Sequence, residues 1–301
     1  MRIVVALGGN ALLRRGQPME LEVQRANVAV AARAVAELAG EHQLVVTHGN
    51  GPQVGLLALQ AEAYQEVRPY PLDVLDAESQ GMVGYLLQLG LENELRRRRV
   101  AALLTRTVVD ADDPAFRHPT KPVGPVYPED VARKLAAERG WTIAPDDSYY
   151  RRVVPSPEPR DIVEFRTIRL LLDADVLEIC VGGGGVPVVV SEDGQIRGVE
   201  AVVDKDLAAS LLAQRVAAHL LLLLTDVPAV ELDWGTPAAR PIARATPAEL
   251  RRYLFAPGSM GPKVEAACRF VEATRGVAAV GHLKDAARIV RGEAGTRVVP
   301  E

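Results

Sequence analysis

Residues 2–10 of this 301-residue chain read Arg-Ile-Val-Val-Ala-Leu-Gly-Gly-Asn, a short apolar run that ends in two glycines. Three later stretches repeat the pattern of an apolar run followed by turn residues: 44–51 (LVVTHGNG), 177–185 (LEICVGGGG) and 219–226 (HLLLLLTD). Strands that are apolar throughout, rather than in alternation, are typical of a parallel sheet buried on both faces. The pattern predicts an α/β fold.

Longer helical patterns separate these runs, as a parallel sheet requires. They cover residues 20–38, 78–99, 204–215 and 264–274. The second pattern ends in Arg96–Arg99, and cations suit the end of a helix. We therefore expect a mostly parallel sheet with helices on both faces.

Residues 107–163 interrupt the alternation. They hold nine prolines and are too long for an ordinary loop. We expect them to form an inserted lid subdomain.

Composition excludes several classes of protein. The net charge of −4 leaves no electrostatic footprint for nucleic acid. Residues 207–224 are broken by Gln214, Arg215 and His219, so no membrane span is expected. Two cysteines far apart in the chain are typical of reduced thiols, and residues 1–7 are too short for a signal peptide. We expect a cytoplasmic location.

Glycines gather where the apolar runs end, and in a parallel sheet ligands bind beyond the carboxyl ends of the strands. Glycine there lets backbone N–H groups approach phosphate or carboxylate oxygens. Any one of these loops could be only a tight turn, but together they favour a site for anionic ligands. A second interpretation starts from Gly49–Gly55, which is close to a dinucleotide fingerprint and would suit a nicotinamide-dependent oxidoreductase. The acidic residue expected about 20 positions later is missing.

The chain contains six times as many Arg as Lys residues, so its five lysines are unusual positions. Lys121 lies between prolines in the expected lid, Lys205 lies between two aspartates, and Lys263 follows a glycine-rich turn. Lys134 and Lys284 lie in polar helical stretches and look like solvated surface residues. Three lysines near anion loops favour phosphoryl transfer, which depends on positioning and on cations around the transferred group. Asp206 would hold Lys205 and Lys263, although it could also be a plain carboxylate of a first helical turn.

Ordered motifs along the whole chain resemble those of the carbamate kinases within the amino-acid kinase superfamily. The matching segments are residues 6–12 (ALGGNAL), 47–55 (THGNGPQVG), 80–85 (QGMVGY), 105–110 (TRTVVD), 112–116 (DDPAF), 119–125 (PTKPVGP), 151–157 (RRVVPSP), 182–185 (GGGG), 198–206 (GVEAVVDKD), 224–227 (LTDV) and 258–266 (GSMGPKVEA).

The resemblance implies a three-layer αβα sandwich with a protruding lid, formed as one domain over 1–301, and a homodimer. It implies reversible transfer between ATP and carbamate, giving ADP and carbamoyl phosphate with Mg²⁺. Residues 1–200, lid included, would be the acceptor half and 201–301 the nucleotide half. The implied catalytic residues are Lys121, Lys205, Lys263 and Asp206; the carbamate and phosphoryl loops are Gly8, Gly9, Asn10, Gly49, Asn50 and Gly51; the nucleotide residues are Thr225, Asp226, Met260 and Gly261. No residue is expected to be a dedicated metal ligand.

The residue at position 6 distinguishes acetylglutamate-type kinases from carbamate kinases within the superfamily. Acetylglutamate-type kinases carry Lys two residues before the first Gly-Gly, and this chain has Ala6 there. Lys121, delivered by the lid, would replace the missing cation, which favours carbamate as the acceptor. An acetylglutamate-type kinase and a non-catalytic sensor of nucleotide or carbamoyl phosphate remain as alternatives.

Overall fold

The computed structural model describes residues 1–301 except 10–11, 15, 65, 147 and 257. Within this part of the chain, eight strands form the central sheet in the order β15-β17-β16-β12-β1-β2-β9-β3. Their bounds are β1 Arg2–Leu7, β2 Gln43–His48, β3 Val100–Ala102, β9 Leu177–Ile179, β12 Leu220–Thr225, β15 Arg244–Ala245, β16 Val277–His282 and β17 Thr296–Val298. The pairing is parallel throughout, except between β16 and β17.

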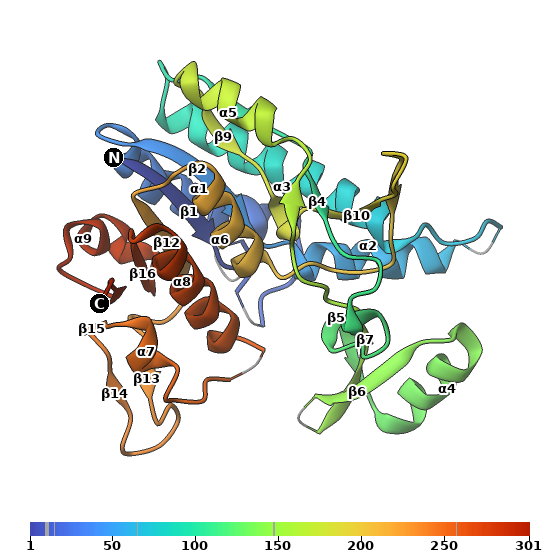
Figure 1. The fold of residues 1–301 in the computed structure, drawn as a ribbon. Coiled ribbons are helices and arrows are strands. Elements are labelled where there is room, and N and C mark those ends of the chain that lie inside the picture. The colour runs from blue at the N-terminus through green and yellow to red at the C-terminus, as the bar shows by residue number, and fades with distance from the viewer. Residues whose placement is uncertain (10–11, 15, 65, 147, 257) are drawn as a thin grey trace.

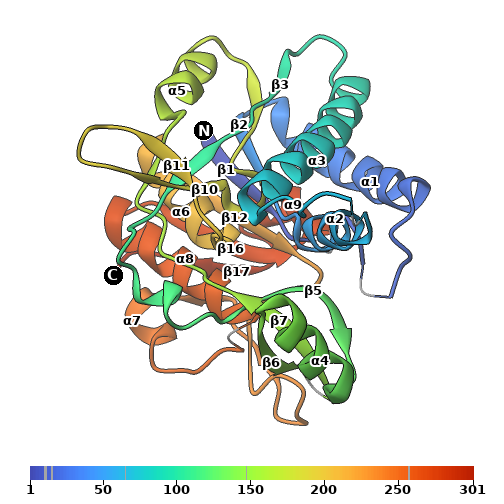
Figure 2. The same cartoon turned by 90° about the vertical axis from the view of Figure 1, so that its right-hand side faces the viewer.

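Helices cover both faces of this sheet, so the expected three-layer α/β fold is confirmed (Figure 2). Odd-numbered residues of β1 pack with three helices: α1 Leu21–Ala39, α3 Leu72–Glu94 and α9 Ala286–Arg291. Even-numbered residues of β1 face four others: α5 Phe165–Asp173, α6 Lys205–Arg215, α7 Pro247–Leu250 and α8 Met260–Thr274. The central strands are therefore buried on both sides, which explains why their sequences are apolar throughout.

The expected helix over residues 78–99 was misplaced. Helix α3 begins at Leu72, immediately after Pro71, and ends at Glu94. Arg96–Arg99 therefore follow the helix instead of forming its last turn. Arg98 turns back to the body, where it pairs with Asp175 and donates to the carbonyl of His42. Arg98 also donates to the carbonyl of Ala39, the last residue of α1, so its charge serves distant segments rather than the end of α3.

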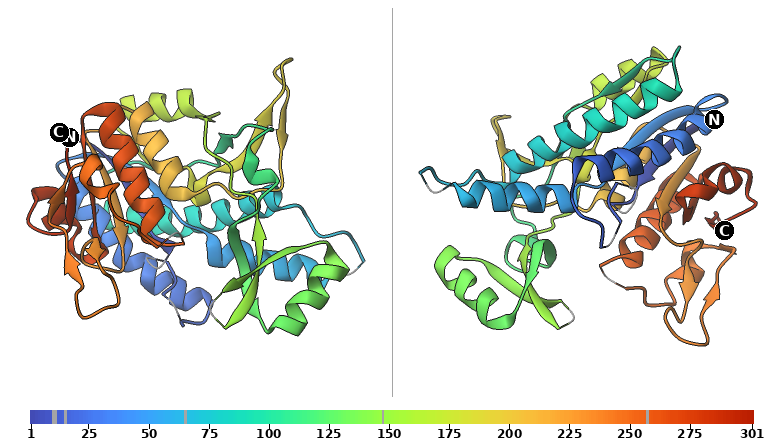
Figure 3. Two further views of the ribbon diagram at one scale, coloured as in Figure 1. Left: turned by 60° about the horizontal axis from the view of Figure 1, so that its bottom comes forward. Right: turned by 180° about the vertical axis from the view of Figure 1, so that it is seen from behind.

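Two smaller sheets lie beyond the central one, the first at the junction with the lid and the second within the lid. The first has the order β11-β10-β4-β8, with β4 Arg106–Val108, β8 Asp161–Ile162, β10 Val186–Val190 and β11 Ile196–Gly198. The second is the antiparallel sheet β5-β7-β6 of the lid, with β5 Lys121–Tyr127, β6 Thr142–Asp146 and β7 Tyr149–Val154. Helix α4, Glu129–Arg139, packs on β6 and β7, and this outer part of the lid projects from the body (Figures 1 and 3). Its inner strand β5 packs against α2, Gly51–Ala63, where Val123 shares a buried apolar cluster with Val54.

The lid leaves and rejoins the body at one place, because β4 pairs with β8 and Thr107 lies opposite Ile162.

The remaining elements are helix α2 Gly51–Ala63, the pair β13 Glu231–Leu232 and β14 Arg240–Pro241, and the short 3-10 turns η2 Pro114–Phe116, η3 Gly182–Gly184 and η4 Leu283–Asp285. No helix among the described residues is long and apolar enough to cross a membrane.

Candidate active site

The first turn of α6 organises the site. Asp204 is the N-cap residue, and its Oδ1 accepts hydrogen bonds from the backbone N–H groups of Asp206 and Leu207 at 2.9 and 3.2 Å. A carboxylate in this position satisfies N–H groups that a helix leaves free and complements the helix dipole. This leaves Oδ2 of Asp204 facing away from the helix.

Asp206 is buried and holds two of the three candidate lysines. Its Oδ1 accepts from Nζ of Lys205 at 2.6 Å, and its Oδ2 accepts from Nζ of Lys263 at 3.1 Å. Burial alone would raise the pKa of Asp206, but the charges of the two lysines outweigh it and hold the pKa at about 2. Asp206 is therefore ionised at any physiological pH.

Lys263 differs from Lys205 in its electrostatic surroundings. Burial opposes the charge of both side chains. Asp206 more than compensates at Lys205, where the pKa is raised. At Lys263 burial and the nearby charge of Lys205 prevail, so its pKa is lowered. Two ammonium groups thus share one carboxylate, and an additional anion placed between them would be stabilised.

Lys121 reaches the same helix start from the lid. It is the first residue of β5, and its Nζ donates to the free Oδ2 of Asp204 at 2.7 Å. Three lysines from three separate elements, β5, α6 and α8, therefore meet at the two carboxylates of one helical turn. From the sequence, Asp204 is only the first residue of the helical pattern 204–215; its contact with Lys121 could not be predicted, because the two residues come together only through the fold.

The glycine loops after β1 and β2 lie against Lys205. The N–H of Gly8 donates to the carbonyl of Leu224, and the N–H of Gly49 donates to that of Leu7. A Cβ at Gly49 would lie 3.2 Å from both the N of Gly9 and Cδ of Lys205. Only glycine fits this contact without displacing a neighbour. Asn10 lies outside the described residues.

Asn50 is held by a buried polar group that sequence reasoning missed. Its Nδ2 donates to Oδ1 of Asp76 and, at 2.7 Å, to Oγ of Ser79, both on α3. Gly183, with φ +67°, lies so close that a Cβ there would be 2.2 Å from Nδ2 of Asn50. Burial raises the pKa of Asp76 to about 7. Asp76 and Ser79, spaced i, i+3 between the apolar positions Leu75 and Val83, were the available signal.

His48 has a structural role. Its ring is buried against Gly182, where a Cβ would lie 2.4 Å from the ring, and Nδ1 lies 3.0 Å from the carbonyl of Gly49. Burial lowers the pKa of His48 to about 4, so the ring is neutral at pH 7. The neutral ring supports the glycine loops and brings no positive charge to the site.

The four candidate nucleotide residues occupy two places. Thr225 and Asp226 follow β12 and line a cavity of about 210 Å³ together with Arg14, Asn27 and Lys284. Met260 and Gly261 form the first turn of α8, the same turn that carries Lys263. The second pair therefore adjoins the lysine cluster directly.

No group of three or more His, Cys, Asp or Glu side chains that could hold a metal occurs within the described part of the chain. Both oxygens of Asp206 are engaged by lysines. The arrangement suits a site in which positively charged ammonium groups and neutral backbone N–H donors converge on an anionic group that is transferred between two ligands.

Comparisons with known proteins by family, by sequence and by structure give the same result. The amino acid kinase family matches residues 1–280. The carbamate kinase of Rhizobium meliloti is 54% identical over 300 residues, covering 98% of this chain and 92% of the relative. The carbamate kinase of Pyrococcus furiosus is 47% identical over 312 residues, covering 99% of each. The structure of the Giardia lamblia carbamate kinase bound to AMP-PNP superimposes with a TM-score of 0.91 at 38% identity, covering 100% of this chain and 98% of that one.

Proposed function

This chain belongs to the amino acid kinase family and, within it, to the carbamate kinases, and we propose that it transfers a phosphoryl group reversibly between ATP and carbamate. The products in one direction are ADP and carbamoyl phosphate. The convergence of Lys121, Lys205 and Lys263 on Asp204 and Asp206 supports this function most directly. A transferred phosphoryl group needs positive charge on both sides and little covalent help.

Each lysine would act at a different part of the transfer path. Lys121 comes from the lid and would contact the group on the carbamate side, since Ala6 supplies no cation there. Lys263 lies in the first turn of α8 with Met260 and Gly261 and would contact the phosphates of the nucleotide. Lys205 lies against Gly49 and would stabilise the transferred phosphoryl itself. Asp206 is a positioning residue that keeps the last two ammonium groups charged and in place.

The glycine loops would bind the acceptor end. The backbone N–H groups of Gly9 and Gly51 and the side chain of Asn10 would receive carbamate and the phosphoryl oxygens, and Oδ1 of Asn50 would accept a hydrogen bond from the carbamate N–H. Gly8 and Gly49, whose N–H groups already donate to Leu224 and Leu7, would let the two loops come close to the ligand. Thr225 and Asp226 would contribute to the nucleotide half. We propose on this basis that residues 1–200 serve mainly the acceptor and 201–301 mainly the nucleotide.

Mg²⁺ would arrive with the nucleotide. The described residues offer no set of metal ligands, and Mg²⁺ typically binds nucleotide phosphates, water and one or two carboxylates. Bound there, the ion would neutralise phosphate charge. The protein's own part is to position the acceptor, the phosphoryl group and the three ammonium groups.

We further propose that the protein is a cytoplasmic homodimer. Tyr85 and Leu89 are exposed on α3, four residues apart on one helical face. Cys180 and Cys268 are buried and free, as thiols are in a reducing compartment. Light scattering on the purified protein tests the assembly, and a Tyr85→Glu change should produce monomers if this face of α3 forms the contact.

One assay tests the proposed activity. The purified protein is incubated with ADP, Mg²⁺ and carbamoyl phosphate, and ATP is measured. ATP formation is expected. Turnover of N-acetylglutamate with ATP would instead indicate the acetylglutamate-type alternative, and binding of carbamoyl phosphate without turnover would indicate a sensor. Binding of NADH would revive the oxidoreductase interpretation.

A further inference from the structure

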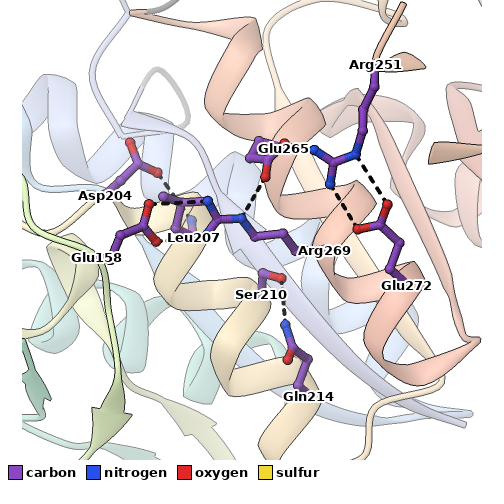
Figure 4. Close-up of polar contacts among 9 residues, drawn as sticks. All are labelled: Glu158, Asp204, Leu207, Ser210, Gln214, Arg251, Glu265, Arg269 and Glu272. Carbon is purple, nitrogen blue, oxygen red and sulfur yellow. Dashed lines mark hydrogen bonds and ion pairs between the residues drawn. The ribbon is translucent and has the colours of Figure 1, made fainter. Parts of the chain in front are cut away.

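Arg269 joins two parts of the molecule on the outer side of α8. Its guanidinium contacts Glu158 with two hydrogen bonds, Nη1–Oε2 at 2.6 Å and Nη2–Oε1 at 3.2 Å (Figure 4). Its Nε donates to Oε1 of Glu265, one turn earlier on the same helix, at 2.7 Å. The helical partner fixes the direction of the side chain, and the two-pronged contact with Glu158 restricts its geometry.

Glu158 belongs to the segment that leads from the lid back to the body. The segment begins after β7, and the N–H of Val202 donates to the carbonyl of Pro155 within it. The N–H of Glu158 donates to Oδ2 of Asp113, on the segment that leads out to the lid. Glu158 therefore connects both chain segments at the base of the lid with α8.

The same strand that precedes Glu158 sets the place of Lys121. Lys121 lies opposite Val154 in the β5–β7 pair, and the N–H of Thr120 donates to the carbonyl of Val154 at 3.2 Å. Three contacts consequently form a closed triangle between the lid, α6 and α8. Its sides are Lys121–Asp204, Lys263–Asp206 and Glu158–Arg269.

We propose that Arg269 and Glu158 are positioning residues for phosphoryl transfer, because their ion pair holds the base of the lid at a defined place relative to α8. The pair thereby sets the separation of Lys121 and Lys263 across the site. This inference rests on the proposed function of the two lysines. Neither Arg269 nor Glu158 needs to touch substrate for this role.

Because both side chains of the pair are partly exposed, its loss should affect the free energy of unfolding less than the rate of the reaction. The side chains of Arg269 and Glu158 are 39% and 41% exposed, so breaking the pair should change overall stability little. A misplacement of about 1 Å in a reacting constellation can nevertheless cost up to about 10²-fold in rate. A positioning contact of this kind is therefore expected to show in kcat much more than in the melting temperature.

Arg251 provides a matched control. It also makes paired contacts with carboxylates of α8, to Glu272 at 2.9 and 3.2 Å and to Glu265 at 2.9 Å (Figure 4). Among the described residues, these side-chain contacts of Arg251 reach α8 and not the lid. Arg251→Gln removes the same charge beside the same helix and leaves the lid base in place.

The experiment compares Arg269→Gln, Glu158→Gln, the double variant and Arg251→Gln in ATP formation from ADP and carbamoyl phosphate. We expect kcat to fall about tenfold in both lid-base variants, with KM for ADP changed less than about twofold. The double variant should be no worse than the worse single one, since both break one contact. Arg251→Gln should keep the wild-type kcat.

Hydrogen exchange of the intact protein gives an independent readout. Amides of β5 and β7 should exchange faster in Arg269→Gln and Glu158→Gln but not in Arg251→Gln. Equal kcat losses in Arg251→Gln, additive losses in the double variant, or unchanged exchange in the lid would each overturn the proposal. If the wild-type protein makes no ATP, the proposed function fails, while the exchange comparison still tests the contact.

Discussion

Lys121 and Asp204 lie 83 positions apart in the chain, and the ammonium group of the first donates to the carboxylate of the second at 2.7 Å. One residue opens the first strand of the lid, and the other caps α6 in the body. This contact brings the lid lysine to the helical turn that holds the other two.

Replacing Lys121 by Ala should lower kcat by about 10³-fold, as expected for a cation that stabilises the transferred group. Lys121→Arg keeps the charge but replaces a compact ammonium with a planar fork, and we expect a large loss there too. Steady-state kinetics measures both. Lys134→Ala is the control, because Lys134 is an exposed lysine of the same lid that pairs only loosely with Glu138 at 3.9 Å. A loss under about tenfold for Lys121→Ala, or full activity for Lys121→Arg, would remove the assigned role.

Asp206→Asn should destabilise the protein at neutral pH, because Lys205 and Lys263 lose their shared counter-charge. The folded pKa of Asp206 is about 2, against 3.8 for an ordinary Asp. The depressed value means that the stabilisation is present above pH 3.8 and is lost as pH falls through 2. The shift corresponds to about 2 kcal/mol.

Urea unfolding at pH 7 and at pH 3 measures this effect. The difference between wild type and Asp206→Asn should be full at pH 7 and smaller at pH 3. Asp112→Asn removes an exposed carboxylate and should change the free energy of unfolding by less than about 0.5 kcal/mol. A pH-independent difference for Asp206→Asn would contradict the electrostatic explanation.

Glu178→Gln should have a larger free energy of unfolding than the wild type, and the difference should grow as pH rises. Glu178 is fully buried in β9, neither of its carboxyl oxygens has a hydrogen-bond partner among the described residues, and burial raises its pKa to about 8. Since the folded pKa lies above the ordinary value of 4.5, folding at higher pH requires either proton uptake or a buried charge. The cost grows from pH 4.5 to pH 8, and Gln does not incur it.

We expect the stability gain of Glu178→Gln to increase by about 2–4 kcal/mol between pH 5 and pH 8. Denaturant unfolding at both values measures it. Glu94→Gln, at the exposed end of α3, should show no such trend. Equal gains at the two pH values would mean that Glu178 finds a partner when ionised.

Gly183→Ala should damage both stability and activity. Gly183 and Gly194 both have positive φ, +67° and +82°, but only Gly183 has a side chain in the way, that of Asn50. Gly194→Ala should therefore cost only the backbone strain, about 1 kcal/mol. Gly183→Ala should cost more and should lower kcat by at least about tenfold, because Asn50 must move. Thermal unfolding and kinetics of the pair measure this, and equal effects of the two changes would show that the contact is unimportant.

The fold class could be predicted from the sequence because strands buried on both faces have a simple signature. Uninterrupted apolar runs such as residues 3–7 and 220–224 lie in the central strands β1 and β12. Helix ends were harder. The charge pattern placed the end of α3 at Arg99, whereas Arg98 is satisfied by contacts with Asp175 and His42 from distant segments.

The individual residues of the candidate site could be predicted from the sequence for a different reason. In a chain that favours Arg, a lysine flanked by glycine, proline or aspartate is conspicuous. The partners of the site residues could not be predicted, because Asp76 contacts Asn50 from another helix and Asp204 contacts Lys121 of the lid. Local sequence shows which residue types are unusual, but only the tertiary fold decides which of them share a proton, a charge or a cavity.

The pairing of β4 with β8 marks a point at which this fold can accommodate an inserted segment. The lid departs and returns between two strands that are already hydrogen-bonded, with Thr107 opposite Ile162. A gene segment inserted at that point would add a new subdomain without changing the order of any strand in the central sheet. The lid carries Lys121 and so, on the proposed assignment, part of the choice of acceptor. A change confined to this one stretch of chain would therefore alter acceptor preference and leave the strand order of the central sheet as it is.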